Sequence, residues 1–230
     1  MKLKIIFLLL VAAKLYAQDI TKVEYISAFK LADDESKHSP KQIANLSYTL
    51  VFDHKQSIFK KIKRLGLDQQ VKNRRLISMA NIKGVYYKNS QDKTNILITE
   101  QDGKRYLIDK SKSNWNWEIL KETKQILGYK CYKALGTRKE YNYVLKKDRT
   151  LKAIVWFTPK IPLPFGPADF GGLPGLVLES QRGSFYIIAK KIKHKSSNKA
   201  LKIDLDKGIK LTDEEFARKQ YAAFMDRIRQ

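Results

Sequence analysis

The segment Phe165–Glu179, with the sequence FGPADFGGLPGLVLE, interrupts an otherwise strand-rich sequence. Five of the six prolines lie between Pro159 and Pro174, and four of the eleven glycines lie between Gly166 and Gly175. Prolines remove the N–H donors that a central strand needs and fix φ, whereas glycines allow positive φ and close backbone contacts. The segment is therefore predicted to leave the sheet as a stiff crossing that returns directly into a strand.

This crossing is unusually apolar for a loop, and that leaves two hypotheses open. It is either a rigid crossover that plugs one end of a curved sheet, or the lip of an apolar binding cavity with Asp169 as its one exposed charge. The two hypotheses are compatible, and the same residues form the candidate binding loop in both: Pro162, Phe165, Gly166, Pro167, Asp169, Phe170, Gly172, Leu173, Pro174, Gly175 and Leu176.

Alternation of apolar and polar residues predicts short strands along most of the chain. The firmest local prediction is a hairpin of Asn95–Glu100 and Arg105–Asp109, because the Asp-Gly pair between them supplies the positive φ of a tight turn. The other expected strands are 23–31, 46–52, 57–62, 84–88, 115–120, 129–136, 150–158, 176–179 and 184–192.

The C-terminal segment has a different pattern. Thr212 to Glu215 form a capping box, and apolar residues then recur at helical spacing from Phe216 to Ile228. The lysine- and serine-rich segment 190–202 is expected to be mobile. The predicted fold class is mainly β (α+β), a curved antiparallel sheet of about nine or ten strands with a C-terminal amphipathic helix.

The first residues have the parts of a secretory signal. Lys2 and Lys4 precede an apolar run from Ile5 to Ala13, and cleavage is expected after Ala17. We therefore expect a signal peptide at 1–17, a single β-rich domain at 18–230, and export to the periplasm or the exterior. The apolar run is too short to span a bilayer, so no transmembrane span is expected after cleavage.

The formal charge of +23 favours anionic partners in principle. The cations are mostly lysines spread along the whole chain, which is typical of a solvated surface, so only weak contact with anionic surfaces is expected, centred on Lys190–Lys202. No nucleic-acid partner is expected for an exported chain.

Catalytic and metal-binding motifs are missing from the sequence. The three histidines, His38, His54 and His194, lack ligand spacing, and no metal or cofactor is expected. No serine has the context of a nucleophile elbow, and no glycine loop precedes a helix. Cys131, the one cysteine, is predicted to be a buried, unreactive thiol.

Several segments resemble the GLPGLI family. Gly172–Val177 reads GLPGLV, and Lys124–Ala134 is similar to the family's K-x-I-x-G-Y-x-C-x-K-A segment. Trp156-Phe-Thr, Ile161-Pro and Gly166-Pro167 also match family elements. The resemblance implies an exported protein of Bacteroidetes-type bacteria with no assigned activity, and it carries over no catalytic residue.

These observations favour a non-enzymatic cell-envelope module. Its expected partner is an apolar or glycan-bearing envelope ligand, or a partner protein, held beside the Pro/Gly loop. The alternative is a hydrolase of envelope peptides or glycans, whose carboxylates the fold would assemble from distant positions. That alternative requires two acidic groups in one cleft with displaced pKa values.

Overall fold

The computed structural model describes residues 18–30, 41–62, 78–197 and 201–229. The expected signal peptide, the loop around His38 and most of the basic segment after Lys63 lie outside these residues. A single sheet contains twelve strands in the order β12-β6-β5-β4-β3-β2-β1-β11-β10-β9-β8-β7. Neighbouring strands are antiparallel except for β12 and β6, which are parallel. The predicted fold class is confirmed, with more strands than expected.

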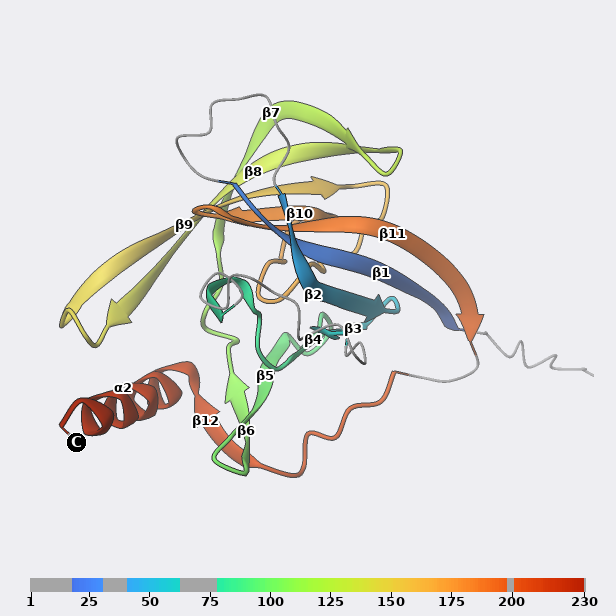
Figure 1. Ribbon diagram of the computed structural model, residues 1–230. Helices are drawn as coiled ribbons and strands as arrows, with labels where there is room; N and C mark the ends of the chain where they lie inside the picture. Colours follow the sequence, from blue (N-terminus) through green and yellow to red (C-terminus); the bar gives the residue numbers. More distant parts are fainter. Residues whose placement is uncertain (1–17, 31–40, 63–77, 198–200, 230) are drawn as a thin grey trace, which may run out of the picture.

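The strands and the helix have the following bounds: β1 Gln18–Phe29, β2 Lys41–Phe52, β3 Gln56–Lys61, β4 Val85–Asn89, β5 Thr94–Gln101, β6 Lys104–Asp109, β7 Asn116–Ile126, β8 Tyr129–Asn142, β9 Lys147–Thr158, β10 Leu176–Arg182, β11 Phe185–Ser197, β12 Ile209–Thr212 and α2 Asp213–Arg229. The sheet is strongly curved: β7 to β11 lie on one side of the molecule and β4 to β6 on the other (Figure 1).

Two local predictions from turn and cap chemistry are confirmed. The β5–β6 hairpin turns at Asp102 and Gly103, whose φ values are 50° and 69°. The amide of Glu215 donates to the Thr212 hydroxyl at 3.2 Å, and the Glu215 carboxylate accepts from the Thr212 amide at 2.8 Å. Thus the capping box starts α2 as expected.

Helix α2 is less buried than its spacing suggests. It lies beside β12 and the far end of the β8–β9 hairpin (Figure 1), where Phe216 packs against Tyr106 with ring centroids 5.8 Å apart. None of its residues is buried, and Phe224 remains 46% exposed.

The segment 190–202 was expected to be mobile, and this was wrong for its first part. β11 continues through it to Ser197, pairing with β1 along its whole length. This pairing supplies hydrogen-bond partners to the backbone groups of β11 that face β1, and it needs no apolar side chains.

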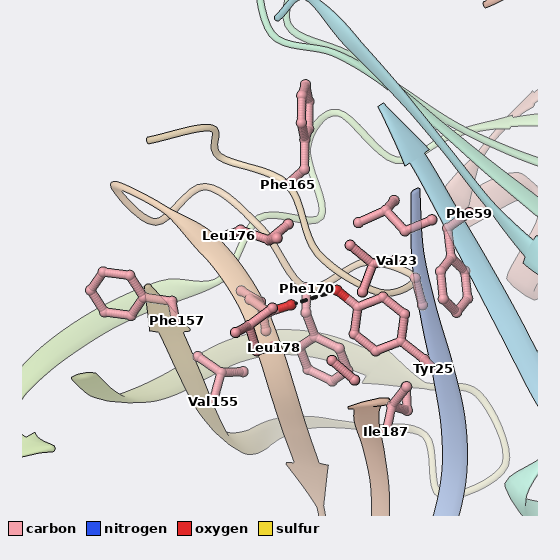
Figure 2. Packing of buried hydrophobic residues seen from close by; sticks show 14 of the residues in the cluster. Val23, Tyr25, Phe59, Val155, Phe157, Phe165, Phe170, Leu176, Leu178 and Ile187 are labelled. Carbon is pink, nitrogen blue, oxygen red and sulfur yellow. Dashed lines mark hydrogen bonds between the residues drawn. The ribbon is translucent and has the colours of Figure 1, made fainter. Parts of the chain in front are cut away.

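The core lies between the sheet and the β9–β10 loop, as Figure 2 shows for the cluster around Tyr25, Phe165 and Leu178. Phe165 packs against Phe52 with ring centroids 5.8 Å apart. The Tyr25 hydroxyl is fully buried and donates to the Val177 carbonyl at 2.7 Å. This bond ties β1 to the start of β10 across 152 positions of sequence.

We expect Tyr25→Phe to lower the free energy of unfolding by roughly 1–3 kcal/mol, because the buried Val177 carbonyl loses this donor. Urea denaturation followed by tryptophan fluorescence would measure it. Tyr141→Phe is the matched control, since Tyr141 is 47% exposed, and it should change stability by no more than roughly 0.5 kcal/mol. Equal stabilities of wild type and Tyr25→Phe would contradict the prediction.

Candidate functional site

The β9–β10 loop, residues 159–175, places its predicted binding residues in three different environments. Most of them are buried, and three are exposed to solvent: Pro162, Gly172 and Pro174. Asp169 lies between these extremes, with 13% of its side chain exposed. The buried members are Phe165, Gly166, Pro167, Phe170, Leu173, Gly175 and Leu176. The loop thus belongs largely to the core.

Two glycines of the loop allow close packing of the backbone. A Cβ at Gly166 would collide with the carbonyl oxygen of Phe170, and a Cβ at Gly175 would collide with that of Thr158. Neither glycine has a positive φ, so space and not backbone conformation requires glycine here.

A cavity of about 650 Å³, called here the concave cavity, opens beside Ala168, Asp169 and Phe170 of this loop. Its size falls within the range of small-molecule sites. Side chains from the sheet, from the segment before β4 and from α2 complete the wall, and they include Asn81, Lys83, Tyr86, Glu100, Lys110, Arg138, Ser180, Arg182, Phe185, Phe216 and Arg227.

Asp169 is the acidic centre of this cavity, and it is not the exposed charge that the sequence suggested. Its carboxylate accepts from Arg138 of β8 at 2.6 Å, and the two side chains are 13% and 9% exposed. The Arg138 guanidinium also lies 4.6 Å from the ring of Trp115, which stacks on Phe170 at 5.5 Å. The pair is therefore held in position by aromatic packing on the loop side.

Lys88 of β4 carries a further positive charge behind the cavity wall. A Cβ added at Gly171 would come within 3.0 Å of its Nζ, so the ammonium group lies against the loop backbone. Burial lowers the pKa of Lys88 to about 8. The negative charge of Asp169 raises this pKa, whereas the positive charges of Arg138 and Lys110 lower it further.

The charges around Asp169 decide its protonation. Burial by itself would raise its pKa, but Arg138, Lys88 and Lys110 together hold the pKa below its usual range. The carboxylate is therefore ionised at neutral pH, when it accepts hydrogen bonds and donates none. Burial raises the pKa of the nearby Tyr86 hydroxyl above its usual range, so Tyr86 remains a neutral phenol able to donate a hydrogen bond.

Two buried polar atoms on the cavity wall have no hydrogen-bond partner among the described residues. They are the Ser180 hydroxyl of β10 and the side-chain carbonyl of Asn81. Ser180 is only 1% exposed. Buried polar groups in folded proteins are nearly always paired, so these two atoms are exceptions to that rule beside the cavity.

The hydrolase hypothesis required two carboxylates in one cleft, and Asp169 and Glu100 line the same cavity. The second requirement was displaced pKa values for both groups; Asp169 meets it for one of them, and its displacement is downward. Such a carboxylate can orient a hydroxyl or amide group of a substrate, but it cannot act as a general acid at neutral pH.

Most of the residues that surround Asp169 were not predicted from the sequence. The strand expected at 129–136 extends as β8 to Asn142, which places Arg138 inside the strand, two residues beyond the buried Gly136. Period-2 alternation through Ala134, Gly136 and Arg138 was the available signal, because an arginine continuing a row of small inward-facing residues indicates a buried cation.

Other candidate groups do not join the site. Cys131 is fully buried, as predicted, and burial raises its pKa to about 11. His194 is hydrogen-bonded to Thr21 at 2.9 Å on the β1–β11 pair. Within the described ranges, no three histidine, cysteine or acidic side chains gather as a metal site would require. Nor does any helix there have the length and apolarity to cross a membrane.

Comparison with known proteins identifies a family. The family described as "N-glycanase peptide, N-terminal domain" matches residues 72–215, which is more than half of the chain. The chain belongs to this N-glycanase domain family. The match includes β4 to β12, and with them the Arg138–Asp169 pair and most of the cavity wall.

Two solved structures have a fold similar to that of this chain. A structure of PNGF-II in space group C2 superposes with a TM-score of 0.57 at 17% identity, covering 87% of this chain and 32% of that one. A second structure of PNGF-II, in space group P21, superposes with a TM-score of 0.56 at 18% identity, covering 88% of this chain and 33% of that one. The chain thus spans about a third of the length of these proteins. No curated protein matches it.

These findings correct two predictions. The resemblance to the GLPGLI family is wrong, because the N-glycanase family is the one that matches. The glycines of the motif were a poor guide to the family. Gly166 and Gly175 meet a packing requirement of the crossing loop, and such a requirement does not identify a family. The non-enzymatic module is likewise replaced, because the match favours the peptide or glycan hydrolase alternative.

Proposed function

We propose that this chain takes part in hydrolysing the bond between an N-linked glycan and its peptide, and that the concave cavity holds the glycan-bearing part of the substrate. The observation that carries the proposal is the position of the cavity: its ionised Asp169 and most of its wall fall within residues 72–215, which match the N-glycanase family.

The surface of the cavity suits a sugar. Pyranose rings present both hydroxyl groups and apolar C–H faces, and small-molecule sites combine apolar walls with a few placed polar groups. The aromatic rings of Tyr86, Phe170 and Phe185 supply the apolar wall. The Asp169 carboxylate, whose side chain is 13% exposed, supplies an acceptor for sugar hydroxyls.

Asp169 also suits the scissile group of such a substrate. N-linked glycans join their peptide through an amide, and a fixed carboxylate can accept that N–H and orient the amide for attack by water. Because Arg138 bonds to one oxygen of Asp169 at 2.6 Å, the carboxylate has a fixed direction. Glu100 lies at the exposed rim, where it is the second carboxylate of the cavity.

The test is an incubation of the purified chain with a peptide that carries one N-linked glycan, in water enriched in ¹⁸O. Hydrolysis of the amide converts asparagine to aspartate with one ¹⁸O, which mass spectrometry detects. Saturation-transfer NMR measures binding of the same glycopeptide. For the wild-type chain we expect a positive result in both measurements. In Asp169→Asn we expect binding and hydrolysis each to fall by at least an order of magnitude, because the variant loses a charge-assisted hydrogen bond.

Asp148→Asn is the matched control, since Asp148 is exposed on β9 and lies outside the cavity. It should behave as the wild type. A wild-type chain that neither binds nor cleaves the glycopeptide would overturn the proposal, as would equal behaviour of Asp169→Asn and Asp148→Asn.

A further inference from the structure

The concave cavity carries an excess of positive charge. Five cationic side chains line it against two carboxylates, which is an excess of three. The carboxylates are Glu100 and Asp169. The cations are Lys83, Lys110, Arg138, Arg182 and Arg227. A recess lined by one sign of charge concentrates that field and attracts ligands of the opposite sign.

Only two of these cations have acidic partners among the described residues. Arg138 pairs with Asp169, and Lys110 pairs at 2.8 Å with Asp213 at the start of α2. The other three, Lys83, Arg182 and Arg227, are exposed at the rim, and none of them has a carboxylate within 4 Å in the described parts of the chain.

A further cation lies behind the cavity wall. Lys88 lies behind Gly171, and the charges that act on it are Asp169, Arg138 and Lys110. Arg138, Lys88 and Lys110 thus all act on the Asp169 carboxylate, while the three rim cations have no acidic partner among the described residues.

We propose that the concave cavity selects N-glycans that carry an anionic sugar, one bearing a carboxylate or an acidic ester. This inference rests on the proposed function and names the substrate class of that same site. Asp169 would accept from a ring hydroxyl, while the rim arginines receive the anion, for which the planar guanidinium group is suited.

The overall charge of the chain is a competing explanation, because a formal +23 attracts any anion to the surface. The experiment must therefore separate the cavity from the remaining surface. Arg182→Gln/Arg227→Gln removes two rim cations without breaking an ion pair among the described residues. Lys139→Gln/Lys152→Gln removes two exposed cations outside the cavity, and it is the matched control.

The measurement is calorimetric titration of the chain with a biantennary N-glycopeptide that ends in sialic acid, and with its desialylated counterpart. For the wild type we expect the acidic glycopeptide to bind on the order of tenfold more tightly, equivalent to about 1.4 kcal/mol. The rim variant should lose most of this preference, because its affinity for the acidic glycopeptide should fall by more than its affinity for the neutral one. The control variant should keep the preference.

Two further probes identify the source of the negative charge. A desialylated glycan with a sulfate ester tests the acidic ester, and a neutral glycan on an aspartate-rich peptide tests the peptide. Tight binding of either sialylated or sulfated glycan supports the inference. A preference only for the acidic peptide overturns it.

Equal affinity for acidic and neutral glycopeptides overturns the inference and leaves the proposed function standing, because the glycan is still bound. Equal losses in the rim and control variants also overturn it, since general surface charge then explains the preference. Failure to bind or cleave any glycopeptide would instead overturn the proposed function.

Discussion

Arg138→Met is expected to lower the free energy of unfolding at neutral pH by about 3–5 kcal/mol, the usual cost of leaving one partner of a buried ion pair without the other. Methionine keeps the apolar stem against Trp115 but removes the guanidinium that donates to Asp169 at 2.6 Å. It also removes the bond from Arg138 to the Ser113 carbonyl. Urea denaturation monitored by circular dichroism would measure the change.

The pH dependence of this loss follows from Asp169. Its pKa in the folded protein lies below its usual range, and the unfolded value is about 3.9. The stabilisation is therefore present above the unfolded pKa and disappears as the pH falls through the folded pKa. We expect the difference between wild type and Arg138→Met to shrink below about pH 4.

Two other variants make the result interpretable. Arg138→Met/Asp169→Leu removes both charges and should recover much of the loss, because an apolar pair of similar volume often replaces a buried ion pair. Lys22→Met breaks a pair with Glu24 whose side chains are 44% and 32% exposed, and it should cost no more than about 1 kcal/mol. Equal costs for Arg138→Met and Lys22→Met would contradict the assignment of a buried pair.

The elements that the sequence predicted correctly are those that depend on local chemistry. The Asp102-Gly103 turn requires positive φ at both positions, and the Thr212–Glu215 box satisfies its own helix amides. The departure of the Pro/Gly segment from the sheet is of the same kind, because proline cannot donate a ladder hydrogen bond. Each of these features is determined within four to sixteen residues of sequence, roughly one turn or one loop.

The features that were missed depend on distant residues. Arg138 and Asp169 are 31 positions apart, and no local sequence pattern near either residue predicts its contact with the other. The polar end of β11 is a strand only because β1 supplies backbone partners there, with Thr21 opposite His194 and Lys22 opposite Lys193. The cavity combines side chains from six strands, three connecting segments and α2, so its charge emerges only after folding.

Gly175→Ala is expected to lower the free energy of unfolding by roughly 3 kcal/mol, at the upper end of overpacking costs. The added Cβ would collide with the Thr158 carbonyl oxygen, and it would lie 2.7 Å from the Thr158 carbonyl carbon and 3.0 Å from the Pro159 Cα. All three atoms belong to the backbone at the end of β9, so no side-chain rotation relieves the overlap. Either the loop or the β9–β10 pairing must shift.

Gly183→Ala is the control that separates crowding from backbone conformation. Gly183 has φ of 58° in the β10–β11 turn, and a Cβ there would meet no atom within 4 Å. Its cost should be only about 1 kcal/mol, from the left-handed conformation. Thermal unfolding of both variants would compare them. If Gly175→Ala lowered the stability by less than Gly183→Ala, the prediction would be contradicted. The loop could then shift to accommodate the added Cβ, and the close packing of Gly175 against β9 would not be what anchors it.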